Sequence, residues 1–325
     1  MAKKNLVSLL TGRPSVVCIL IYVVMFIVYA SVQGRFAVTP YGLSVLLNNS
    51  ISLAIGASAI TFVILTGGFD LSLAGIVALT NSVLAVVGFR GVGGAIEALI
   101  VVLAIGCMVG AVNGYFVAYA KLQSIAATLG TMIMTSGIAL LLLNAPGGQI
   151  SDTIAYGLTG MIGPVPVAAI ILLIYTAILW CVLSYSKFGV SVFSIGQDRI
   201  AARGSGINVE RTEFCAYVVS GVLAGFCGYI VSAQTGTGDP RFDASFLLLA
   251  FAAVAIGGTS FRGGRGTVLG SVVGAGLLEL IQKTLFAIGV SSFFTGMFEG
   301  GLMILAVLIG SLTSRTAEGG SAEAR

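Results

Sequence analysis

The stretch VPVAAIILLIYTAILWCVL, residues 165–183, contains no charged residue and few polar ones. A helix of this length extends about 30 Å, which is the thickness of the hydrocarbon core of a bilayer. Other runs without a charge occur at 16–30, 99–105, 140–143 and 302–309. The stretch therefore predicts a membrane-spanning helix in a chain that contains several.

The composition of the whole chain supports the same interpretation. Of 325 residues, 57% are hydrophobic and 9% are charged, whereas a soluble domain carries about 25% charged residues. So few charges cannot cover a globule of this size, which excludes a water-soluble fold. We predict an all-α, polytopic membrane protein with about ten transmembrane helices. The predicted spans are 16–33, 43–65, 71–88, 95–119, 125–143, 164–184, 212–233, 244–258, 266–282 and 294–312.

The distribution of positive charge predicts the orientation. If every span crosses fully and the N-terminus is cytoplasmic, four basic residues lie outside and the rest lie inside, as expected when Lys and Arg resist translocation. The outer four are Arg35, Arg90, Arg241 and Lys283. Residues 1–15 and 313–325 are then cytoplasmic, the second as a disordered tail, and 185–211 is the richest basic loop. The first span also resembles a signal peptide, but nine further segments favour an uncleaved helix.

Several function classes are excluded by missing residues. The chain has no histidine and no Gly-Lys dipeptide, so imidazole catalysis, most zinc sites and the phosphate-binding loop of ATPases are absent. We predict no catalytic residue, no cofactor and no metal site. The net charge of +4 reflects charge retained on the inner side rather than nucleic-acid binding. The cysteines occur singly and are interpreted as packing residues: Cys18, Cys107, Cys181, Cys215 and Cys227.

Glycines recur every four residues in three segments. Small residues on one helix face let membrane helices approach closely, so these rows predict packing faces. The rows are Gly106/Gly110/Gly114, Gly221/Gly225 and Gly266/Gly270/Gly274.

Two glycine-rich junctions interrupt the hydrophobic pattern. In the first, residues 66–75, Gly67 and Gly68 break the helix, and Asp70 and Ser72 are suited to cap the next one. Contact of Asp70 with a substrate or gate is the alternative. The second junction, residues 255–267, resembles a phosphate cradle but lacks the lysine. It is better explained as a tight cytoplasmic turn.

The loop 185–211 contains a short predicted helix, Gln197–Arg203. Asp198 lies near its start, Gly204 and Gly206 can stop it, and residues 200–202 would form a small apolar knob in the cytosol. Such a knob suits docking to a partner, although a simply solvated loop has the same composition.

Polar side chains within the spans are candidates for a substrate path, because each needs a partner away from lipid. Hydrogen bonding between helices is the alternative for each. The path candidates are Asn48, Asn49, Asp70, Asn81, Asn113, Thr128 and Thr131, with Thr135, Glu279 and Glu299 as further polar positions. The set is largely neutral, which favours a neutral, hydroxyl-rich solute over a proton-coupled pump.

Four segments together resemble the permease family of bacterial ABC sugar importers, the ribose, galactose, xylose and autoinducer-2 type. They are Gly67–Ser72, Val112–Gly114 leading to Ala127–Met132, Ile195–Ile207, and Ile256–Gly266. Their order along the chain makes the resemblance specific. Phe69 and Ala74 depart from the isoleucine and glycine usual in the family.

The resemblance implies a type II ABC importer-like permease in a bacterial inner membrane. It implies a second permease subunit, identical or a sister, with two cytoplasmic ATPase subunits and a periplasmic sugar-binding protein. It also implies that a coupling helix seats in the ATPase. The expected coupling residues are Gln197, Asp198, Arg199, Ile200, Ala201, Ala202, Arg203, Gly204 and Gly206.

Other functions remain open at this point. An ion- or proton-coupled secondary transporter would need a buried acid, for which Asp70 is the candidate. A permease for branched-chain amino acids is the nearest alternative within the family. The external loop 144–163 and the carboxylates Glu279 and Glu299 are candidates for contact with a binding protein. The sequence does not name the sugar.

Overall fold

The computed structural model describes residues 14–301 except 243, 292–293, 295–296 and 298–299. Within this part the chain is almost entirely helical, with one two-stranded antiparallel hairpin. The elements are α2 (Pro14–Gln33), η1 (Gly34–Val38), α3 (Pro40–Leu65), α4 (Leu73–Val87), α5 (Gly91–Gly114), η2 (Tyr115–Tyr119), α6 (Ser124–Leu142), α7 (Asp152–Thr159), β1 (Met161–Ile162), β2 (Val165–Pro166), α8 (Val167–Tyr185), α9 (Lys187–Gln197), α10 (Arg199–Gly204), α11 (Val209–Thr235), α12 (Ala244–Ile256) and α13 (Val268–Ala287).

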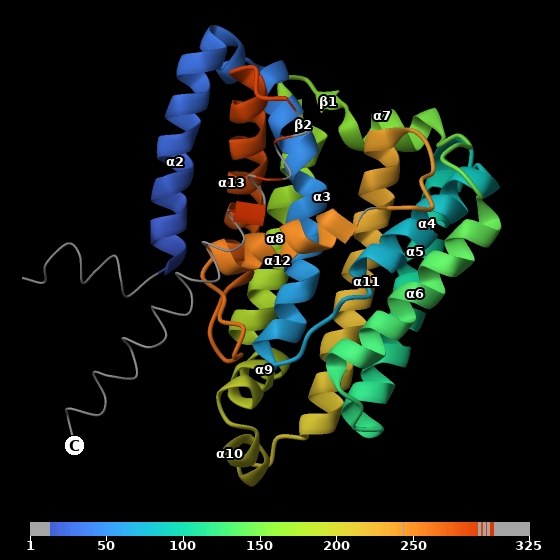
Figure 1. Ribbon diagram of the computed structural model, residues 1–325, viewed down its shortest axis with the longest axis vertical. Coiled ribbons are helices and arrows are strands. Elements are labelled where there is room, and N and C mark those ends of the chain that lie inside the picture. Colours follow the sequence, from blue (N-terminus) through green and yellow to red (C-terminus); the bar gives the residue numbers. More distant parts are fainter. Residues whose placement is uncertain (1–13, 243, 292–293, 295–296, 298–299, 302–325) are drawn as a thin grey trace, which may run out of the picture.

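The helices pack around α3 and α11. Helix α3 is buried along most of its length, and α11 lies between it and the layer formed by α4, α5 and α6 (Figure 1). On the other side of α3, α13 separates it from α2. Large apolar side chains of α2 and α8 point outward, as in Ile27 and Leu173, which is the arrangement expected of helices that face lipid rather than water.

Glycine rows confirm the predicted close packing of α5 on α11. A Cβ added at Gly106 would lie 2.1 Å from the carbonyl oxygen of Gly221, and one at Gly221 would lie 2.2 Å from that of Gly106. Only glycine permits backbones at this distance. Gly274 packs in the same way on Ala253 of α12, and Gly270 packs on Gly257, directly after that helix. The prediction was wrong for Gly266, which precedes α13 and has φ +151°.

Two of the about ten predicted spans, 71–88 and 244–258, correspond to short helices in the structure. Seven helices of the described part are long and apolar enough to cross a membrane. Helix α4 has 15 residues and α12 has 13, so each extends only about 20 Å, less than the roughly 30 Å of a bilayer core. Residues 66–72 before α4 and 257–267 after α12 are not helical, and α12 lies across the direction of α3 and α13 (Figure 1). The predicted span 294–312 lies almost entirely outside the described residues.

Both glycine-rich junctions end their helices in the same way. Gly67 has φ +86° and Gly258 has φ +83°, a left-handed conformation that glycine adopts without steric cost. In each case the next N–H group donates to the carbonyl five residues earlier, at 3.1 Å. This Schellman arrangement satisfies the last carbonyls of the helix and lets the chain leave at an angle.

The two ends of the molecule differ in structure. Helices α9 and α10, the α5–α6 connection and the segment 257–267 lie at one end, which we call the α10 end; α7 and the β1–β2 hairpin lie at the opposite end (Figure 1). Loop 236–239 belongs to the opposite end, where Gly238 forms a backbone bridge to Gly147.

Candidate functional site

Helix α10 is capped at its start and ended by a glycine. The side chain of Asp198 accepts hydrogen bonds from the N–H groups of Ile200 (2.8 Å) and Ala201 (3.0 Å), as an N-cap residue does. Gly206, with φ +82°, ends the helix. The prediction of one helix over 197–203 is corrected to two: Gln197 closes α9, and α10 begins at Arg199.

One face of α10 is exposed and the other is packed. Ile200 is 85% exposed, and Ala201 is exposed beside it. Ala202 is 4% exposed because it packs with Ile195 and Val209. The predicted knob of residues 200–202 therefore consists of Ile200 and Ala201 alone, while Ala202 attaches the helix to the body of the protein.

A junction of glycines holds the end of α9 against the end of α3. A Cβ at Gly196 would lie 1.9 Å from the carbonyl oxygen of Leu65 and 2.2 Å from the amide nitrogen of Gly264. The Gly264 N–H donates to the same Leu65 oxygen at 2.9 Å, and the Gln197 side chain donates to the carbonyl of Gly264 at 3.4 Å. Gly263 also lies against Gly67. The end of α3, the end of α9 and the loop with Gly263 and Gly264 are distant in sequence. Glycines are needed here because the three backbones lie in contact.

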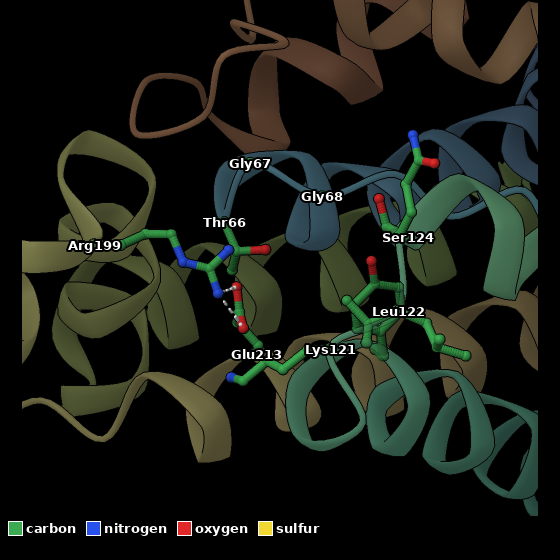
Figure 2. Close-up of a pocket in the computed structure, with 11 residues that line it drawn as sticks. Thr66, Gly67, Gly68, Lys121, Leu122, Ser124, Arg199 and Glu213 are labelled. Carbon is green, nitrogen blue, oxygen red and sulfur yellow. Dashed lines mark hydrogen bonds and ion pairs between the residues drawn. The ribbon is translucent and has the colours of Figure 1, made fainter.

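Ion pairs hold the outer side of α10. Arg199 lies 2.6 Å from Glu213, whose side chain is 5% exposed (Figure 2). Arg203 pairs with Glu210, and Lys121 of the α5–α6 connection lies 3.0 Å from the same Glu210 carboxylate. Sequence reasoning missed both glutamates. An acid within one or two turns of the start of an apolar span, directly after a basic loop, is a signal that could have identified them.

A cavity of about 360 Å³ opens beside this ion pair. Gly67 and Gly68 form one wall, the α5–α6 connection forms another, and Arg199 and Glu213 close a third (Figure 2). The cavity lies between the coupling candidates and the helix break before α4.

Four of the predicted path residues lie together in a buried network. Asp70, 1% exposed, accepts hydrogen bonds from the Ser72 N–H (2.9 Å), the Ser72 hydroxyl (2.6 Å) and the Ser220 hydroxyl (2.7 Å). The Asn113 amide donates to Ser72 at 2.9 Å, and Thr131 donates to Asn113 at 2.7 Å.

The same region includes Thr128, whose hydroxyl accepts from the Leu71 N–H at 3.1 Å. The prediction that Asp70 and Ser72 cap the next helix was wrong. Asp70 accepts from the N–H of Ser72, which precedes the first residue of α4, and Ser72 makes no side-chain cap bond. The hydrogen bonds instead connect α4, α5, α6 and α11, which is the interhelical role that the sequence left as the alternative for these residues.

The remaining path candidates lie toward the opposite end. Asn81 donates to Ser232 at 2.8 Å and accepts from the Asp239 N–H at 2.5 Å, so it fixes loop 236–239. Asn48 donates to the Thr159 carbonyl at 2.8 Å. Asn49 is exposed and bonds its own helix.

Of the three further polar positions, the structure describes Thr135 and Glu279. Thr135 donates to the Thr131 carbonyl within α6 at 2.8 Å. Glu279 lies 3.7 Å from Lys283 on α13, and Glu299 lies outside the described residues. In the part of the chain that the structure describes, no group of three His, Cys, Asp or Glu side chains is placed to hold a metal ion.

Comparisons with known proteins identify the family of the chain. The family "Branched-chain amino acid transport system / permease component" matches residues 42–307. The chain is 34% identical to the ribose import permease protein RbsC of Escherichia coli over 264 residues, 79% of this chain and 81% of that one. It is 30% identical to the D-allose transport system permease protein AlsC of Escherichia coli over 91% of both chains.

A probable ABC transporter permease protein of Sinorhizobium fredii is 32% identical over 79% of this chain and 77% of its own. No solved structure matches the chain. The family match covers most of the chain, including both glycine-rich junctions, the α10 end and the buried network around Asp70. The chain therefore belongs to the family of permease components of the branched-chain amino acid transport system type, and is a multi-pass membrane permease rather than an enzyme.

Proposed function

We propose that this chain is the permease subunit of an ABC importer that carries a monosaccharide or a related neutral polyol across a bacterial inner membrane. The observation that carries the proposal is α10, a short capped helix with Ile200 and Ala201 exposed and its other face held by packing and ion pairs. An exposed apolar side chain on an anchored helix suits docking into a groove of a partner.

The α10 end is then cytoplasmic and receives the ATPase subunits. Both termini lie on that side, and the opposite end, with loop 144–163, receives a sugar-binding protein. A second permease subunit, identical or a sister, completes the membrane part. The basic residues Lys121, Arg199 and Arg203 at the α10 end support this orientation, because positive charge is retained on the cytoplasmic side.

The proposed mechanism is alternating access. Binding of ATP draws the ATPase subunits together, and their displacement pushes α10, which passes the motion to the spans as rigid bodies. Such coupling needs contiguous contacts between elements, and α10 has them with α9 and α11.

The proposed substrate class follows from the relatives and from the path candidates. The relatives named above are a ribose import permease and a D-allose transport permease. The path candidates other than Asp70 are neutral amides and hydroxyls, which suit a neutral solute, whereas the zwitterion of an amino acid would need fixed charges.

An ion-coupled transporter has less support, because the candidate acid Asp70 is held by Ser72 and Ser220 in a network that connects helices. Such a transporter needs an acid that is free to exchange its ion or proton.

Introduction of a negative charge at the exposed residues Ile200 and Ala201 tests the proposal. We expect Ile200→Asp and Ala201→Asp to abolish ATP-dependent uptake and copurification of the ATPase while the permease still inserts in the membrane, because a charge opposes burial in an apolar groove. Ile162→Asp, an equally drastic change at an exposed position of the opposite end, serves as the control for ATPase copurification. Unimpaired uptake by both α10 variants would refute the assignment.

A further inference from the structure

Glu213 is a buried carboxylate at the start of a long apolar helix. It lies in the second turn of α11, its side chain is 5% exposed, and its carboxylate contacts the Arg199 guanidinium at 2.6 and 2.7 Å (Figure 2). A buried carboxylate is costly unless it is paired, and at the edge of a membrane such a residue commonly has a functional role. Arg199 is the first residue of α10.

The same face of α11 reaches the helix break before α4. Tyr217 and Ser220 follow Glu213 at four and seven residues, a spacing that places the three side chains on one side of a helix. The Tyr217 hydroxyl donates to the Phe69 carbonyl at 3.2 Å, and the Ser220 hydroxyl donates to Asp70 at 2.7 Å. One polar face of α11 therefore holds α10 at one end and residues 69–70 farther along.

The second acid that holds α10 is more accessible to water than Glu213. Glu210, which holds Arg203 and Lys121, has a side chain that is 28% exposed, and ion pairs accessible to water contribute little. The cavity of about 360 Å³ next to the Arg199–Glu213 pair leaves room for the loop 66–68 and the α5–α6 connection to shift (Figure 2). The Glu213 carboxylate is thus buried beside a cavity, while the side chain of its partner Arg199 is 54% exposed.

We propose that Glu213 is a positioning residue for transport: it ties α10 to α11, and α11 carries the displacement through Tyr217 and Ser220 to the helix break at Phe69–Asp70. The inference rests on the proposed function and deepens it. Ile200 and Ala201 are proposed to dock the ATPase, and Glu213 is proposed to act in the next step, in which the displacement of α10 is passed to α11.

The ratio of solute transported to ATP hydrolysed tests the proposal in vesicles that contain the complete transporter. Glu213→Gln keeps the shape of the side chain but removes its charge. We expect the variant to retain the ATPase subunits and to hydrolyse ATP, while solute transported per ATP falls at least tenfold. Glu97→Gln, the same change at an exposed position of α5, is the matched control and should keep the normal ratio.

A second variant separates transmission from folding. The exchange Arg199→Glu with Glu213→Arg restores an ion pair of opposite direction and should recover a third or more of the normal ratio, whereas each single charge reversal should not. A Glu213→Gln transporter with the normal ratio would overturn the proposal. So would a loss of uptake that is matched by the loss of folded permease, since that assigns only a structural role. Failure of the unmodified chain to bind any ATPase would instead refute the proposed function itself.

Discussion

Asp70 accepts hydrogen bonds from the backbone and the hydroxyl of Ser72 and from the hydroxyl of Ser220. Ser72 in turn accepts from Asn113 of α5, which accepts from Thr131 of α6. A buried donor that loses its acceptor has no water to replace it. This single carboxylate is therefore central to the contacts among four helices.

We expect Asp70→Asn to destabilise the permease by about 1–3 kcal/mol, because an amide group in place of one carboxylate oxygen would leave a buried hydroxyl donor without an acceptor. The measurement is the Tm of the purified permease in detergent. Asp152→Asn, at an exposed position of α7, should change stability by no more than about 0.5 kcal/mol. Equal Tm values for the two variants would show that the network around Asp70 does not stabilise the fold.

Individual residues were predictable from the sequence where their chemistry contrasts with their surroundings. Asp70 stands out as an acid beside two glycines in an apolar chain, and Asp198 stands out before a short basic helix. Glu213 is marked only by its place near the start of an apolar span after a basic loop, and that signal does not identify its partner Arg199, 14 residues away. Only the folded chain brings such partners together.

At the level of elements, hydrophobicity located the helices but not their lengths. The pattern identifies segments that are stable in lipid, and α4 and α12 satisfy it although they have only 15 and 13 residues. Their lengths depend on where the Gly-Gly pairs end a helix and on what the released chain contacts. The Leu65 carbonyl, for example, accepts from Gly264, a contact that no local signal predicts.

The glycine junction between α3 and α9 provides a test of that contact. We expect Gly196→Ala to lower ATP-dependent uptake at least tenfold, because the new Cβ would meet the Leu65 oxygen at 1.9 Å and must separate the two helix ends. Uptake is measured per amount of permease in the membrane. Gly137→Ala on α6, where a Cβ meets nothing within 4 Å, should leave uptake within twofold. Normal uptake by Gly196→Ala would mean that the junction can open without loss of function.

The molecule as a whole has two ends with different tasks in the proposed function. Three ion pairs lie at the α10 end, whereas side-chain amides of Asn48 and Asn81 fix loops and short elements at the opposite end. The buried network around Asp70 and the packing of α5 on α11 connect the two ends. A force applied to α10 can therefore reach the opposite end only through the spans, which is what alternating access requires.

This arrangement predicts which residues an impermeant thiol reagent reaches on each side of the membrane. In a chain whose five cysteines are replaced by serine, Ser205→Cys should react only from the cytoplasmic side and Asp152→Cys only from the periplasmic side, since both positions are exposed at opposite ends. The physical reason is that the basic residues beside α10 resist translocation. If Ser205→Cys reacted in intact cells, the orientation would be opposite to the proposed one. Helix α10, with Arg199 and Glu213, would then face a compartment without ATP and could not bind the ATPase.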